Sequence, residues 1–290
     1  MSLYSSVALP FLEYGFMRRA LLASISLGLG AGPVGVILML RRMSLVGDAM
    51  SHAVLPGAAI GFLVSGGLSL FAMGVGGIIA GLSVALLSGM VSRGTVLKED
   101  ASFASFYLAS LALGVLIVSL RGSNIDLLHV LFGTILSIDH DAIFMVGAIT
   151  SFTLITLALI YRPLVAECFD PSFLRSVRGR GALYHLLFLF LLVINLVAGF
   201  QTLGTLMSVG MMMLPAAVAQ LWGRTLLAMA IIAACVAAFS GFLGLLFSYH
   251  LHFASGPTII LVATVIYLLS LVCAPSGILR RRLKRPHLVG

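Results

Sequence analysis

An aspartate and a histidine lie four residues apart in the segment RRMSLVGDAMSHAVLPG, residues 41–57. If this segment is helical, Asp48 and His52 share one face, with Cβ atoms about 5–6 Å apart. A carboxylate oxygen and an imidazole nitrogen at that spacing suit one divalent transition-metal ion. Two ligands do not complete a coordination shell. A two-fold dimer with this helix at its axis would supply two aspartates and two histidines.

The same pair also has a purely structural interpretation, which the residues alone leave open. Asp48 could cap a helix start, and His52 could bond a backbone carbonyl on a neighbouring helix. Pro56 bears on the choice, because proline has no N–H to offer the carbonyl four residues earlier, which belongs to His52. We therefore expect a kink at Pro56 and a freed carbonyl oxygen that points toward the candidate ligands.

The elements that must position these residues are membrane-spanning helices. The chain has 290 residues, of which 61% are hydrophobic and only 9% charged, and its mean hydropathy is +1.18. Its apolar runs reach the length of about 20 residues that a spanning helix needs. They predict an all-α polytopic bundle of eight or nine spans in one domain, residues 1–290, with the short segment 127–138 leaving the count open. The runs cover residues 20–40, 49–65, 68–92, 102–120, 142–161, 183–201, 203–221, 226–248 and 257–275.

Asp48 is unusual among the nine carboxylates of the chain. We expect the other acids to lie in loops, except for Glu13 near the N-terminus. An ionisable group inside a membrane span is costly to bury and indicates function by default. This contrast marks Asp48 as a candidate functional residue, while the residues alone leave the metal-ligand and structural interpretations equally open.

The net charge of +8 reflects short basic clusters at the ends of the apolar runs, so we expect no nucleic-acid partner. The clusters predict that the C-terminus is cytoplasmic, on the same side as Arg41. The opposite face then carries four polar residues that could contact a metal during its delivery, although loop residues of this kind often have no such role. They are Asp139, His140, His250 and His252.

The longest excursion on the basic side is the segment 162–182. Asp170 and Pro171 are suited to the cap and first turn of a short helix there, as a rigid contact with another subunit would require. The only lysines are Lys98 and Lys284, and neither lies in a GxxxxGK[ST] loop. We therefore expect no ATP site, no cofactor and no enzymatic activity in this chain.

Three blocks resemble the membrane permeases of bacterial zinc and manganese ABC importers, a family that also includes iron transporters. They are MSLVGDAMSHAVLPGAAIGF, GTLMSVGMMMLPAAVAQLW and FDPSFLRSVRGRG. The resemblance implies a bacterial inner-membrane homodimer with cytoplasmic ATPase subunits and an extracytoplasmic metal-binding protein. It also implies that Asp48 and His52 line the metal path. The last block implies ATPase docking through Asp170, Pro171, Phe173 and Arg175, although Ser172 replaces the acid that is usual after Asp-Pro.

Together these features predict ATP-driven import of a divalent transition metal, with zinc first and manganese next. Iron is a further candidate for the same kind of importer. A different class of protein, a proton-coupled secondary transporter in which Asp48 and His52 carry protons, is also compatible with the sequence. An intramembrane aspartyl protease is not, because its chemistry pairs two carboxylates.

Overall fold

The structure is a computed structural model that describes residues 9–66, 69–97, 99–120, 138–169 and 181–277. Within these ranges the chain is helical, with no strand, and nine of its helices are long and apolar enough to cross a membrane. A short helix, α2 (Leu9–Glu13), precedes them. The long helices are α3 (Gly15–Leu40), α4 (Ser44–Ser65), α5 (Leu70–Gly94), α6 (Glu99–Leu120), α8 (His140–Phe169), α10 (Gly181–Leu203), α11 (Thr205–Trp222), α12 (Leu226–Leu251) and α13 (Ser255–Cys273).

The nine apolar runs each fall within one of these long helices or overlap most of it. The expectation of an all-α polytopic bundle is therefore confirmed, while segment 127–138 lies outside the described residues. Several helix boundaries differ from the predicted ones, and the largest difference is at the end of α8. Residues 162–169, predicted as the start of a loop, continue helix α8 through Pro163. Leu164 is buried in the core, and Glu167 pairs with the buried Arg41. These tertiary contacts stabilise the stretch as a helix.

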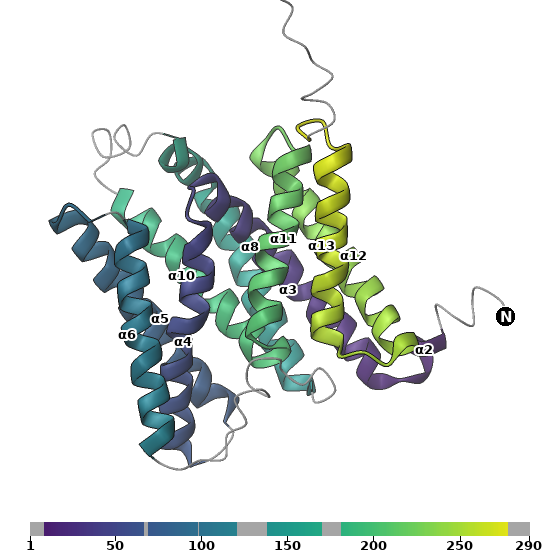
Figure 1. Ribbon diagram of the computed structural model, residues 1–290, viewed down its shortest axis with the longest axis horizontal. Helices are drawn as coiled ribbons and strands as arrows, with labels where there is room; N and C mark the ends of the chain where they lie inside the picture. The colour runs from purple at the N-terminus through teal and green to yellow at the C-terminus, as the bar shows by residue number, and fades with distance from the viewer. Residues whose placement is uncertain (1–8, 67–68, 98, 121–137, 170–180, 278–290) are drawn as a thin grey trace, which may run out of the picture.

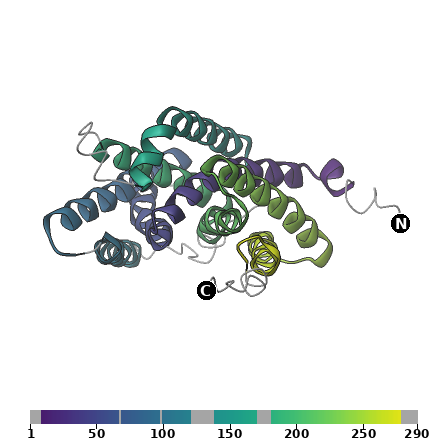
Figure 2. The same ribbon diagram turned by 90° about the horizontal axis from the view of Figure 1, so that it is seen from above.

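The helices form three groups along the longest axis of the molecule (Figure 1). Helices α4, α5 and α6 stand at one end and α12 and α13 at the other, with α3, α8, α10 and α11 between them. Figure 2 shows the same order from above. Helix α3 packs against α8, α11 and α12, and α10 against α8, α11 and α5. These two helices are the most buried of the bundle.

Small residues set the closest helix contacts. Gly57 lies directly against the backbone of Gly76, and Gly61 against that of Ala72, where α4 meets α5. A Cβ atom on Gly28 would come within 2.5 Å of the side chain of Ala237 on α12. Close backbone approach of this kind supplies much of the packing energy between helices in lipid, where the hydrophobic effect gives little help.

Two ends of the bundle can be distinguished from the connections. Helices α3 and α8 finish, and α4 and α10 begin, at one end, which we call the Arg41 end (upper part of Figure 1). Helices α10 and α11 are joined at the opposite end by Gly204, whose φ of 89° is a conformation open to glycine. Helices α12 and α13 meet at that end too, through His252 to Ala254.

Candidate metal site

Helix α4 positions the candidate ligands near the Arg41 end. Asp48 lies four residues after Ser44, which corresponds to a rise of about 6 Å along the helix. The opposite face of this turn is fixed by packing: Met50 is fully buried, and Gly47 faces the side chains of Met212 and Met213 on α11. Because this face is held in the core, Asp48 points away from it.

The two side chains are close enough to share one ion. The Nε2 atom of His52 lies 3.9 Å from the Oδ1 atom of Asp48, beyond hydrogen-bonding distance. Zinc–nitrogen and zinc–oxygen bonds are each about 2.1 Å long, so two atoms on one such ion lie at most about 4.2 Å apart. The pair therefore has a separation that a single divalent ion can bridge. Of the two side chains, Asp48 is 64% exposed and His52 is 31% exposed.

His52 has an aromatic neighbour that the sequence did not reveal. Tyr107 of helix α6 lies nearly parallel to the imidazole, with ring centroids 6.1 Å apart and planes 28° apart. The Nδ1 atom of His52 is buried and has no hydrogen-bond partner among the described residues. Tyr107 lies inside a predicted apolar span, and nothing in its sequence position separates it from a lipid-facing aromatic residue.

Pro56 lies inside helix α4, which remains one helix from Ser44 to Ser65. Helix α6 meets α4 at this place: a Cβ on Gly114 would stand 2.9 Å from the Pro56 side chain. The hydroxyl of Ser110 donates a 3.2 Å hydrogen bond to the carbonyl of Ala53, one residue after His52. Pro56 has no N–H to donate within α4, and near this position a hydroxyl of α6 donates a hydrogen bond to the α4 backbone. The predicted kink, and the use of the His52 carbonyl as a ligand, stay predictions.

One chain supplies only part of a metal shell at this place. Among the described residues, no three His, Cys, Asp or Glu side chains lie close enough together to hold a metal. Asp48 and His52 are therefore a pair without a third protein ligand of these types in the described part of the same chain. Additional ligands would have to come from a second chain, from backbone carbonyls or from water.

The four polar residues predicted for the outer side lie at the end of the bundle opposite Arg41. Asp139 precedes helix α8 and His140 begins it, while His250 and His252 belong to the end of α12. They do not form a metal cluster with any third acid or histidine in the described ranges. Their part in metal delivery stays a prediction.

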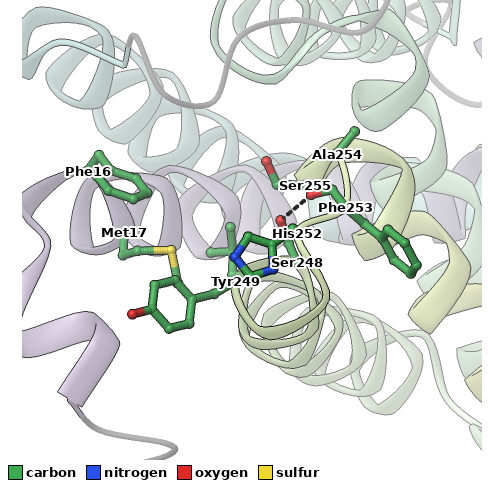
Figure 3. Close-up of a pocket in the computed structure, with 9 residues that line it drawn as sticks. Phe16, Met17, Ser248, Tyr249, His252, Phe253, Ala254 and Ser255 are labelled. Atoms are coloured by element: carbon green, nitrogen blue, oxygen red, sulfur yellow. Dashed lines mark hydrogen bonds between the residues drawn. The ribbon is translucent and has the colours of Figure 1, made fainter.

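His252 lines a cavity of about 370 Å³ between the start of α3 and the α12–α13 connection (Figure 3). Its walls are mainly aromatic and aliphatic, with Phe16 and Met17 on one side and Tyr249 beside the imidazole. The hydroxyl of Ser248 donates a 2.7 Å hydrogen bond to the carbonyl of Phe253, which closes the turn. His252 is the one imidazole, and no carboxylate occurs, among the nine residues that line this cavity. The cavity therefore lacks the ligand set of a metal site.

The predicted docking residues Asp170, Pro171, Phe173 and Arg175 lie outside the described residues. The helices on both sides of them, α8 and α10, are described. They contain a charged cluster that sequence reasoning missed. Glu167, predicted to lie in a loop, is in α8 with a side chain only 11% exposed, and it pairs with Arg41 at 3.1 Å. The expectation that the acids other than Asp48 and Glu13 lie in loops was therefore wrong for Glu167, which is more deeply buried than Asp48. It was also wrong for Glu99, Asp100 and Asp141, which lie in the first turns of α6 and α8.

Similarity to known proteins agrees with this architecture. The model of the ABC 3 transport family matches residues 13–274. The chain belongs to this family. It is 35% identical to the manganese import system permease protein ScaB of Streptococcus parasanguinis, over 91% of this chain and 92% of that protein. It is 37% identical to the manganese transport system membrane protein MntC of Halalkalibacterium halodurans, over 93% and 91% of the two chains.

The solved structure of PsaBC from Streptococcus pneumoniae in complex with Fab has the same fold. It superimposes with a TM-score of 0.83 and 31% identity, over 96% of this chain and 97% of that one. The resemblance to metal ABC importer permeases is thus confirmed. The nine apolar helices found in the described ranges and membership of the ABC-3 family make the chain a multi-pass permease of the bacterial inner membrane.

Proposed function

We propose that this ABC-3 permease carries a divalent transition metal, Mn²⁺ in the first place, from an extracytoplasmic binding protein into the cytoplasm. Cytoplasmic ATPase subunits drive the transport. The observation that carries the proposal is the Asp48–His52 pair, whose Oδ1 and Nε2 atoms lie 3.9 Å apart on the exposed side of helix α4. The basic residues of the Arg41 end support a cytoplasmic position for that end and for the C-terminus.

The exposure of Asp48 supports a homodimer across this face of α4. An ionised carboxylate facing lipid is costly, so such groups face protein or a water-filled path. Here Asp48, 64% exposed, shares this face of α4 with Leu45, three residues earlier and 72% exposed. A second copy related by a two-fold axis would cover this face and add its own aspartate and histidine. The result would be a mixed oxygen and nitrogen shell.

Two considerations favour manganese over the zinc that the sequence analysis ranked first. The relatives with 35% and 37% identity are named for manganese import. Carboxylate, carbonyl and water oxygens suit Mn²⁺, and imidazole is compatible with it in a mixed site. Zinc and ferrous iron remain the competing substrates in the experiment below.

The residues of the pair have separate tasks in this proposal. Asp48 supplies a charged oxygen and His52 a neutral nitrogen, and both must be deprotonated to bind the metal. Protons therefore compete with the metal, and transport weakens as the pH falls. Because both ligands lie near the Arg41 end, release toward the cytoplasm requires only a short path. Entry requires a longer one between the helices.

Uptake by the purified permease–ATPase complex in vesicles, with the binding protein outside, tests this function. Asp48→Asn and His52→Gln should each lower Mn²⁺ uptake by at least the roughly 10–100-fold that loss of a metal's supporting contacts produces. Asp100→Asn is the matched control, because Asp100 is also exposed at the Arg41 end but stands apart from the pair. Wild-type uptake in either pair variant would refute the metal-site assignment.

The driving force and the metal are separated in the same vesicles. An ATPase subunit without catalytic activity should abolish uptake, and collapse of the proton gradient should not. The reverse result would establish the proton-coupled alternative. Inhibition of labelled Mn²⁺ uptake by Zn²⁺, Fe²⁺ and unlabelled Mn²⁺ ranks the three metals as substrates. If Zn²⁺ inhibits uptake more strongly than unlabelled Mn²⁺ does, zinc is the preferred substrate.

A further inference from the structure

A buried charged cluster joins three helices at the Arg41 end. Arg41 follows α3, Glu167 lies near the end of α8, and His185 lies in the second turn of α10. The Nη2 atom of Arg41 is 3.1 Å from Oε2 of Glu167, an ion pair that is not aligned as a hydrogen bond. The Nη1 atom donates a 2.8 Å hydrogen bond to Nδ1 of His185. The guanidinium also lies 4.8 Å from the ring centroid of Phe188.

The cluster is almost closed to solvent. The side chains of Arg41, Glu167 and His185 are 7%, 11% and 11% exposed. A buried ion pair is weak support for stability, because apolar residues of the same volume often stabilise a protein as well or better. Removal of a single partner, in contrast, leaves an uncompensated buried charge. These energetics suit a contact that fixes the relative position of helices.

The cluster lies between the start of helix α4, which carries the metal pair, and the neighbouring ends of α8 and α10. Glu167 is the third residue from the end of α8, and His185 is the fifth residue of α10. On the other side of the cluster, Arg41 is seven residues before Asp48. The three side chains therefore link both flanks of the α8–α10 segment to the start of the metal-bearing helix.

The turn between α3 and α4 is held by a series of backbone hydrogen bonds. Four backbone N–H groups donate hydrogen bonds to carbonyl oxygens here, each with an N···O distance of 3.0 Å. The pairs are Arg41 to Ile37, Arg42 to Met39, Met43 to Leu38 and Val46 to Met43. The backbone of Arg41 is therefore joined to the first turn of α4 by a short, hydrogen-bonded connection. Asp48 begins the next turn of that helix.

We propose that Arg41, Glu167 and His185 form a positioning cluster that couples the end of α8 and the start of α10 to the orientation of Asp48 and His52 on α4. This inference rests on the proposed function, in which the Arg41 end faces the cytoplasmic ATPase subunits and the pair binds Mn²⁺. The cluster does not touch the metal. It keeps helix α4 in register with α8 and α10, so that ATPase closure changes access to the metal pair.

The test measures Mn²⁺ uptake and ATP hydrolysis together in the reconstituted complex with its binding protein. Arg41→Gln should lower the number of ions taken up per ATP hydrolysed at least tenfold, while ATP hydrolysis continues. Arg41→Lys should restore part of this ratio, because it keeps a cation beside Glu167. Arg42→Gln is the matched control, since Arg42 is the neighbouring arginine of the same turn but is exposed. It should keep the wild-type ratio.

A triple variant separates coupling from folding if Arg41→Gln is unstable. Arg41→Met, Glu167→Leu and His185→Phe together remove every charge of the cluster and leave none unpaired. This variant should assemble with the ATPase and bind Mn²⁺ with wild-type affinity, yet transport at a tenfold lower ratio. A wild-type ratio in the triple variant would overturn the proposal. Absence of Mn²⁺ uptake by the wild-type complex would instead refute the proposed function.

Discussion

The Nδ1 atom of His185 accepts its 2.8 Å hydrogen bond from Arg41, which precedes it by 144 residues. Arginine can only donate, so Nδ1 carries no proton in this arrangement, and a neutral His185 has its proton on Nε2. The same Nδ1 is 3.9 Å from Oε1 of Glu167. The imidazole thus acts as an acceptor for the guanidinium beside a carboxylate that competes for the same cation.

Loss of this acceptor should destabilise the bundle. In His185→Leu, a buried donor of Arg41 loses its partner, which costs about 1–3 kcal/mol. His185→Gln offers an amide oxygen to the same donor and should recover most of that loss. Thermal unfolding of the purified permease in detergent measures both variants. Equal unfolding temperatures for the two would show that the hydrogen bond contributes nothing to stability.

The contact between Tyr107 and His52 should affect metal binding. Tyr107→Ala removes the ring beside the imidazole and leaves His52 free to turn away from Asp48, so the apparent affinity for Mn²⁺ should fall about 10–100-fold, as for other supporting contacts of metal ligands. Tyr107→Phe keeps the ring and should bind nearly as the wild type does. Metal titration of the purified permease compares the two variants. If the alanine variant binds normally, the orientation of His52 does not depend on this ring.

The packing of α4 on α5 should tolerate no side chain at Gly57. A methyl group there would overlap the carbonyl of Gly76, and both backbones would have to separate. Gly57→Ala should therefore lower the folded yield and the unfolding temperature. Gly89→Ala, on the same α5 helix, meets no atom within 4 Å and should be neutral, or stabilising by up to about 1 kcal/mol. Opposite results would show that α4 and α5 do not meet at these glycines.

The spans and the Asp48–His52 pair could be predicted from sequence because each depends on spacing within one segment. Four-residue spacing places both ligands on one face of a helix whatever surrounds it. Glu167 was wrongly placed in a loop because its neighbours Arg162 and Pro163 resemble the end of a span. Its burial depends on Arg41, more than a hundred residues away. Long-range pairing of this kind leaves no local pattern.

The burial of Arg41 could not be predicted from the sequence for a related reason. A basic residue directly after an apolar run is typical of the orientation signals of membrane proteins, and both Arg41 and Arg42 fit that pattern. The structure separates them: Arg41 turns into the cluster, whereas Arg42 is exposed and has φ of 59°. Nothing in the dipeptide itself tells which arginine faces inward, because the difference arises from the turn between α3 and α4.

The exposed face of α4 should be the contact between two copies of the chain. Leu45 lies one turn before Asp48 on this face, and a two-fold axis near the aspartate would bring the two copies of Leu45 close together. In a variant whose native cysteines are replaced by serine, Leu45→Cys should form a disulfide-linked dimer under mild oxidation in membranes. Val265→Cys on α13, 54% exposed, should remain monomeric, because the dimer leaves that helix facing lipid. A non-reducing gel measures the amount of cross-linked dimer in each of the two variants. Cross-linking through Val265 and not Leu45 would move the interface to the other end of the molecule and leave Asp48 and His52 without a second pair.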